Sequence, residues 1–144
     1  MSDYTPVYLP GDAMTETASA PVLGGQLLEV TGSGLVGPVT PAALPSAKVV
    51  GVAAGDALIN ARVTFYARAT VHESPAFGTV TAGDQVGAGV TGDTAAGVRT
   101  IPAPALSGSP AGADINTELA RARAVLGVAL TTAASPASCR WMSY

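Results

Sequence analysis

The sequence predicts one all-β domain, a small barrel or sandwich of about six to eight short strands. Three observations support this fold class: a long stretch in which apolar and polar residues alternate, several shorter apolar runs, and abundant turn residues between them. The 144 residues include 17 glycines and 11 prolines, and only 12% are charged. Such a chain is turn-rich and poor in long amphipathic helices, and its length suits a single domain.

The strongest strand pattern lies near residues 58–72. Apolar side chains occupy every second position of this stretch: Ile59, Ala61, Val63, Phe65, Ala67, Ala69 and Val71. A period of two predicts a strand with one buried face. The run exceeds the usual five or six residues, so we expect one long strand that bends midway or extends past its partners. His72 ends the polar face, which predicts a solvated side chain.

Six further strands are expected, each short and bounded by Gly, Pro, Asp or Ser. They cover residues 26–31, 48–53, 85–90, 98–101, 125–131 and 138–142. At most one short helix is predicted, near residues 114–124, where Asp114 can cap the first turn. Because strands and helices do not alternate, the pattern favours a barrel or sandwich over a parallel α/β sheet.

The chain divides into an arm and a domain. Residues 1–21 are predicted to form an extended N-terminal arm, punctuated by Pro6 and Pro10, and residues 22–144 a single β-rich domain with a flexible loop at 103–112. The arm carries four sizeable apolar side chains: Tyr4, Val7, Tyr8 and Leu9. A free tail has little reason to carry them, which indicates a contact surface.

Two short sequence echoes indicate that the chain reuses similar corners. Residues 52–58 recur as 80–86 around an Ala-Gly-Asp turn, and residues 49–53 recur as 125–129 around a central glycine. In the first echo, glycine supplies a positive φ and aspartate accepts hydrogen bonds from nearby backbone amides. We interpret the Ala-Gly-Asp segments as turns with no binding role.

Charge and hydropathy argue against two classes of partner. The net charge is −3, and only seven lysines and arginines are spread along the chain, which leaves no basic stripe for nucleic acid. No basic leader precedes an apolar run, and no apolar stretch approaches the roughly 20 residues that span a bilayer, so neither a standard signal peptide nor a membrane span is expected. The single Cys139 cannot form an intrachain disulfide and is expected to pack in the core.

Residues 32–37 read Gly-Ser-Gly-Leu-Val-Gly, which matches the dinucleotide-binding fingerprint, and Asp56 follows about 20 residues later. The fingerprint requires a helix after the third glycine, and Pro41 and Pro45 would disrupt that helix. A glycine-rich hairpin loop is therefore expected here.

No catalytic, cofactor or metal site is predicted, and the chain is not expected to be an enzyme. His72, Glu73 and Ser74 are neighbours on a strand and alternate between its faces, so they cannot form a relay among themselves. The acidic residues are dispersed, mostly at turns. With one histidine and one cysteine in the chain, a zinc-type cluster is absent.

The order of several short motifs resembles the capsid decoration (cement) proteins of tailed bacteriophages. The residues that carry this resemblance are 10–12 (Pro-Gly-Asp), 17–22, 24–30, 50–53, 82–86 and 125–130, before a terminal strand. They cover most of the chain. The resemblance implies a β-rich protomer, commonly trimeric, that is made in the host cytoplasm and binds the major capsid protein on the outer surface of the virion head.

The resemblance also suggests a role for the arm. A trimer presents three copies of one binding segment, which strengthens weak individual contacts. An extended arm can add a strand to a sheet edge on the capsid and place Tyr4, Val7, Tyr8 and Leu9 against apolar surface. We expect these four residues to contact the capsid, without any cofactor.

Two other functions stay open. Another β-rich virion component, such as a tail-tube or head-fibre subunit, would share the composition. A small trimeric β enzyme with active sites between subunits would need a pocket around Asp56, Asp84 or His72, lined by groups with shifted pKa values.

Overall fold

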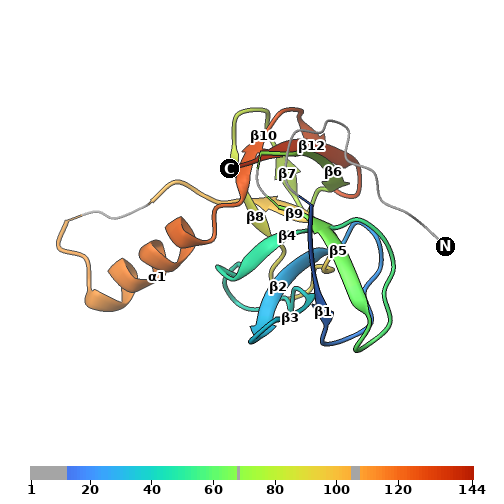
Figure 1. The fold of residues 1–144 in the computed structure, drawn as a ribbon. Helices are drawn as coiled ribbons and strands as arrows, with labels where there is room; N and C mark the ends of the chain where they lie inside the picture. Colours follow the sequence, from blue (N-terminus) through green and yellow to red (C-terminus); the bar gives the residue numbers. More distant parts are fainter. Residues whose placement is uncertain (1–12, 68, 105–107) are drawn as a thin grey trace.

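The computed structural model describes residues 13–67, 69–104 and 108–144 of the chain. Their strands form a closed barrel and a neighbouring five-stranded sheet, and their one helix extends away from both (Figure 1). The fold class predicted from the sequence, an all-β barrel or sandwich with at most one short helix, is confirmed.

The barrel is built from the first five strands. They are β1 (Ala13–Ala18), β2 (Leu27–Gly32), β3 (Leu35–Pro38), β4 (Val49–Ala53) and β5 (Arg62–Tyr66). The order around the barrel is β1-β3-β2-β4-β5, and it closes because β1 pairs antiparallel with β5 and parallel with β3. Closure leaves the barrel without a free sheet edge.

The second sheet contains β6 (Val71–Pro75), β8 (Gln85–Ala88), β9 (Val98–Thr100), β10 (Gly127–Ala129) and β12 (Ser138–Ser143). Its order is β6-β12-β10-β8-β9, with antiparallel neighbours throughout. The short β7 (Thr79–Val80) and β11 (Ala133–Ala134) pair with each other. All six further strands expected from the sequence correspond to strands of the barrel or of the five-stranded sheet.

Two hydrophobic cores meet at β2 and β4. Leu28 and Ala53 belong to the barrel core, whereas the adjacent Leu27 and Val52 belong to the core against the second sheet. Successive strand residues point to opposite faces, so a strand buried on both faces is apolar at consecutive positions. This position explains why β2 and β4 contain runs of adjacent apolar residues.

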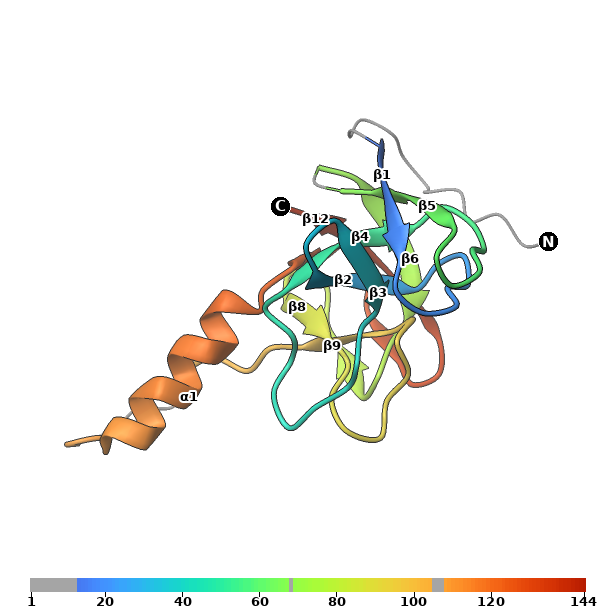
Figure 2. The same ribbon diagram turned by 60° about the horizontal axis from the view of Figure 1, so that its bottom comes forward.

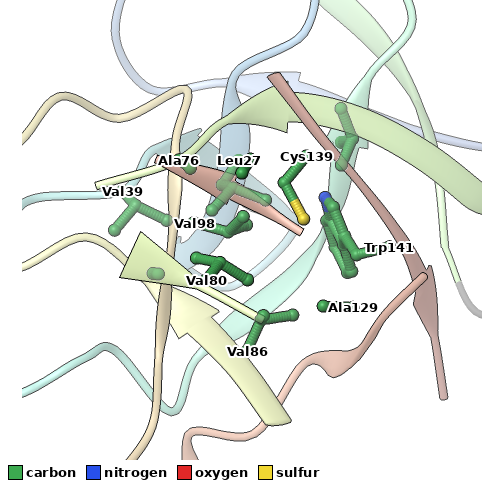
Figure 3. Packing of buried hydrophobic residues seen from close by; sticks show 12 residues of the cluster. Leu27, Val39, Ala76, Val80, Val86, Val98, Ala129, Cys139 and Trp141 are labelled. Carbon is green, nitrogen blue, oxygen red and sulfur yellow. The ribbon is translucent and has the colours of Figure 1, made fainter. Parts of the chain in front are cut away.

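The second core contains the only tryptophan. Figure 3 shows Trp141 and Cys139 of β12 in the same cluster as Leu27, Val86 and Val98. Trp141 is 2% exposed, and its indole N–H donates a hydrogen bond to Ser74 Oγ at 3.1 Å. Cys139 is fully buried with a free thiol, as expected from the sequence.

The single long strand predicted near residues 58–72 is wrong, because the stretch forms two strands in different sheets. β5 ends at Tyr66 and β6 begins at Val71. Ala69 has φ +58 and Asn60 has φ +62, values that strand residues do not adopt. The turn also changes which face is buried: His72 and Ser74 are buried, so the prediction of a solvated His72 is wrong.

The predicted arm of residues 1–21 is too long, because β1 places residues 13–18 in the barrel and Val22 pairs with Ala57 just after it. Residues 1–12 lie outside the described part of the chain, and with them the predicted contact residues Tyr4, Val7, Tyr8 and Leu9. The sequence prediction also missed β3, β7 and β11.

The predicted helix is confirmed as α1 (Gly112–Arg123). Asp114 lies in its first turn and not at its cap: the Asp114 carboxylate accepts a hydrogen bond from the backbone N–H of Ala111, which is the N-cap residue. Residues 103–104 and 108–111 of the predicted loop contain no helix or strand. Within the described ranges, no helix has the length and apolar character to cross a membrane.

Candidate functional site

One end of the barrel opens into a pocket of about 500 Å³, which we call the barrel mouth. At this end β1, β3 and β4 begin and β2 and β5 end. The barrel residues that line it are Met14, Glu16, Val30, Gly32, Gly34, Leu35, Val36, Val49, Val50, Gly51, Phe65 and Ala67. Most of them are apolar, which is typical of binding pockets at the mouths of small barrels.

Strand periodicity explains why these residues line the mouth. Ala18 of β1 is buried in the barrel core, and Glu16 and Met14 lie two and four residues before it. They therefore face the barrel interior at its open end. The register agrees, because Glu16 pairs with Val63 and Met14 with Phe65. Phe65 is 1% exposed and lies deepest among these residues.

The second sheet supplies the other wall of the mouth. Its contributors are His72, Val125, Leu126, Trp141, Ser143 and Tyr144. Tyr144 is 55% exposed, and Met14 and Val30 of the barrel are 48% and 45% exposed. The mouth thus combines a buried floor with a rim of exposed apolar side chains.

Among the lining residues, Glu16 has an acidic side chain and His72 a basic one. His72 is fully buried, and its ring centroid lies 4.9 Å from that of Trp141. Burial lowers the pKa of His72 to about 4, so the imidazole is neutral at pH 7. The Glu16 carboxylate makes no ion pair among the described residues. The mouth is therefore an apolar site with one negative charge, suited to bind an apolar group beside a cation.

The opposite end of the barrel carries an exposed apolar patch, which we call the apolar tip. It consists of Leu23, Leu58 and Ile59, which are 60%, 75% and 55% exposed. Val22 and Ala57 exchange backbone hydrogen bonds of 2.8 and 3.0 Å, which brings Leu23 and Leu58 to the same edge. Large apolar side chains grouped on a surface are typical of contact sites.

The aspartates that the sequence placed at turns stabilise those turns. Asp56 accepts a hydrogen bond from the Gly24 amide at 2.8 Å, and Asp84 accepts bonds from the Thr81 amide and the Thr100 hydroxyl. Gly83 has the expected positive φ of +95, whereas Gly55 of the other echo does not. Neither aspartate lines the mouth.

Three further sequence features have structural explanations. Residues 32–37 form most of the β2–β3 hairpin, and residues 38–48 contain no helix where a dinucleotide site would need one. The Cys139 Sγ–H donates to the Thr131 carbonyl oxygen at 3.3 Å, and burial raises the pKa of its thiol. Across the described ranges, no group of three His, Cys, Asp or Glu side chains could hold a metal ion.

The fold is similar to that of a solved phage protein. The crystal structure of the head fiber gp8.5 N base of bacteriophage phi29 matches with a TM-score of 0.55 and 15% sequence identity, over 92% of this chain and 93% of that chain. No protein-family model matches the sequence, and a search of curated proteins finds no match. The likeness establishes a shared fold that extends over nearly all of both chains.

Sequence reasoning missed the barrel mouth because it missed β1. The segment Ala-Met-Thr-Glu-Thr-Ala contains only one large apolar side chain, and its first three residues are exposed. Once β1 is known, the two-residue spacing from Ala18 to Glu16 and Met14 identifies them as interior positions. His72, the one predicted pocket candidate that does line the mouth, contributes a neutral wall packed against Trp141.

The depressed pKa of His72 predicts acid sensitivity. The unfolded chain keeps a histidine pKa near 6.5 and the folded chain has one of about 4, so the unfolded chain takes up the proton first as the pH falls. This contribution to stability is complete above pH 6.5 and decreases to a loss of about 3 kcal/mol near pH 4. We expect a His72→Gln variant to lose this part of the pH dependence in urea denaturation at pH 7, 5.5 and 4. If the free energy of unfolding changed with pH by the same amount in both proteins, the depressed pKa of His72 would be contradicted.

Proposed function

We propose that this chain is a structural component of a tailed-phage virion that binds the outer surface of the head and stabilises it, as capsid decoration proteins do. The observation that carries the proposal is the likeness to the head fiber N base, which extends over 92% of the chain. The motif order that resembles cement proteins supports the same location. The role requires binding surfaces and no chemistry, because a protein that binds only the assembled shell stabilises it by mass action.

A second candidate is the base of a head fibre. The matched structure is itself described as such a base, and the shared fold favours this role specifically. Both candidates place the barrel on the head and require a contact with the major capsid protein. They differ in whether a fibre extends from the protein.

The head contact is assigned to the N-terminal arm and the apolar tip. The arm carries Tyr4, Val7, Tyr8 and Leu9, and the tip presents Leu58 at 75% exposure. Apolar anchors of this kind provide most of the affinity of a protein interface. A homotrimer would multiply each contact by three and raise the apparent affinity through effective concentration.

The test mixes purified protein with heads of the phage that encodes it, prepared without this protein. We expect co-sedimentation that saturates at multiples of three copies per local symmetry site. Deletion of residues 1–10 or the substitution Leu58→Asn should weaken binding by at least about tenfold. The matched control is Leu130→Asn, since Leu130 lies directly after β10 and is 46% exposed. Failure of the unaltered protein to bind any form of the head would refute the proposed function, and unchanged binding by both variants would refute the assigned contacts.

A further inference from the structure

Helix α1 has an apolar face that its own chain leaves uncovered. None of its residues is buried, and Ile115 and Leu119, one turn apart, are each 47% exposed. Ala122 lies on the same face by helical periodicity. Figures 1 and 2 show the helix extending away from the β body in both views. A helix of 12 residues is marginal in water without packing partners, so its apolar face is a candidate contact surface.

The barrel mouth is a complementary surface on the same chain. It offers an apolar pocket of about 500 Å³ whose rim residues Met14, Val30 and Tyr144 are exposed. A groove of this kind accepts the i, i+4 side chains of an amphipathic helix. The volume lies within the range of about 300 to 1,000 Å³ that binding pockets have.

The charges of the two surfaces match. Arg123 lies one turn after Leu119 and so flanks the apolar face. Arg123 is exposed and forms no ion pair within the described residues, whereas Arg121 pairs with Glu118 at 2.7 Å. The mouth presents the Glu16 carboxylate, which also forms no ion pair with any described residue. An arginine beside an apolar stripe thus has its complement in a carboxylate within an apolar pocket.

The helix of a chain cannot reach its own mouth in this fold. Ala124, directly after α1, is fully buried, and the Leu126 amide donates to Val86 O at 2.8 Å while the Leu126 carbonyl accepts from the Tyr144 amide. Val125 and Leu126 are themselves part of the mouth wall. The C-terminal end of α1 therefore lies at the edge of its own mouth, and the rest of the helix extends away from it, which leaves the apolar face of α1 accessible to another molecule (Figure 1).

We propose that this chain self-associates by exchange of α1: the face formed by Ile115 and Leu119 of one copy packs into the barrel mouth of a second copy, and Arg123 pairs with Glu16 there. The contact is heterologous, so repeating it around a rotation axis closes a ring. Each such contact covers the apolar face of one α1 and the barrel mouth of the next copy. The proposed self-association does not depend on head binding.

The test uses charge reversal in the full-length chain, with mass measured by sedimentation equilibrium over a concentration series. We expect the unaltered protein to form an oligomer, and Glu16→Arg or Arg123→Glu alone to raise its dissociation constant at least about tenfold. The double variant should recover association. A mixture of the two single variants should also associate more tightly than either alone, because every contact between unlike chains then joins opposite charges.

A hydrophobic variant and a control complete the design. Leu119→Asn changes an exposed side chain, so the fold should persist by circular dichroism while association is lost. Leu130→Asn changes a side chain that is 46% exposed directly after β10, and it should leave association unchanged. A monomeric unaltered protein at all concentrations, or an oligomer that Arg123→Glu and Leu119→Asn leave intact, would overturn the proposal. If the protein stays monomeric and Leu119→Asn instead weakens head binding, α1 binds the capsid and the proposal is wrong.

Discussion

Replacing Trp141 with alanine is expected to reduce the free energy of unfolding by about 3 to 5 kcal/mol, a large part of the 5 to 15 kcal/mol that stabilises a typical domain. The indole is 2% exposed, lies in the core between the sheet and the barrel, and packs against His72 with ring centroids 4.9 Å apart. Its removal leaves a cavity and also leaves the buried Ser74 hydroxyl without the indole donor.

The measurement is urea denaturation followed by far-UV circular dichroism, because the variant lacks the only tryptophan. The control is Met142→Ala, the next residue of β12, which faces the other side and is 39% exposed. Its expected cost is about 1 kcal/mol or less. Equal losses for the two variants would show that Trp141 is not a central core residue.

Replacing Gly127 with alanine is expected to lower the free energy of unfolding by about 2 to 4 kcal/mol, through overpacking of the second sheet. A Cβ atom on Gly127 would collide with the carbonyl oxygen of Met142 on the neighbouring β12. Backbone atoms cannot rotate away as a flexible side chain can, so β10 and β12 would have to separate. Gly127 pairs with Ser143 across this contact.

The control for Gly127 is Gly112→Ala, at the start of α1. A Cβ atom on Gly112 meets no atom within 4 Å, so its replacement should change the free energy of unfolding by about 0.5 kcal/mol or less. Thermal and urea denaturation of both variants provide the comparison. A Gly127→Ala protein as stable as Gly112→Ala would contradict the close approach of the two strands.

The second sequence echo corresponds to this same packing constraint. Gly51 and Gly127 occupy equivalent places in residues 49–53 and 125–129. A Cβ atom on Gly51 would collide with the carbonyl oxygen of Tyr66, much as one on Gly127 collides with Met142. The echo therefore marks two strands whose neighbours come unusually close, which only glycine permits.

Much of the fold was predictable because turn residues separate the apolar runs. β2, β4, β8, β9, β10 and β12 all lie within or overlap predicted strands. The errors arose where local pattern and tertiary structure disagree. The alternation of apolar and polar residues continues through residues 59–72, but Asn60 and Ala69 adopt positive φ. Because neither residue is a glycine, the sequence does not indicate these breaks. Half of the residues of β1 are polar and half are exposed, so its place is fixed by pairing with β3 and β5 and not by its composition.

The candidate site was less predictable than the fold. Glu16 and Met14 belong to one end of the chain, and Tyr144 and Trp141 to the other, so their meeting in the barrel mouth depends on barrel closure and on the packing of two sheets. The apolar tip likewise depends on the pairing of Val22 with Ala57. Such long-range contacts leave no periodic signal in the sequence.

Cryo-electron microscopy of virions of the encoding phage tests the central claim most directly. We predict density that fits the barrel and the five-stranded sheet, repeated on the outer surface of the head wherever capsid subunits meet. A mutant phage without this chain should lack that density. Density confined to the tail, or head density that is the same in the normal and the mutant phage, would contradict the account.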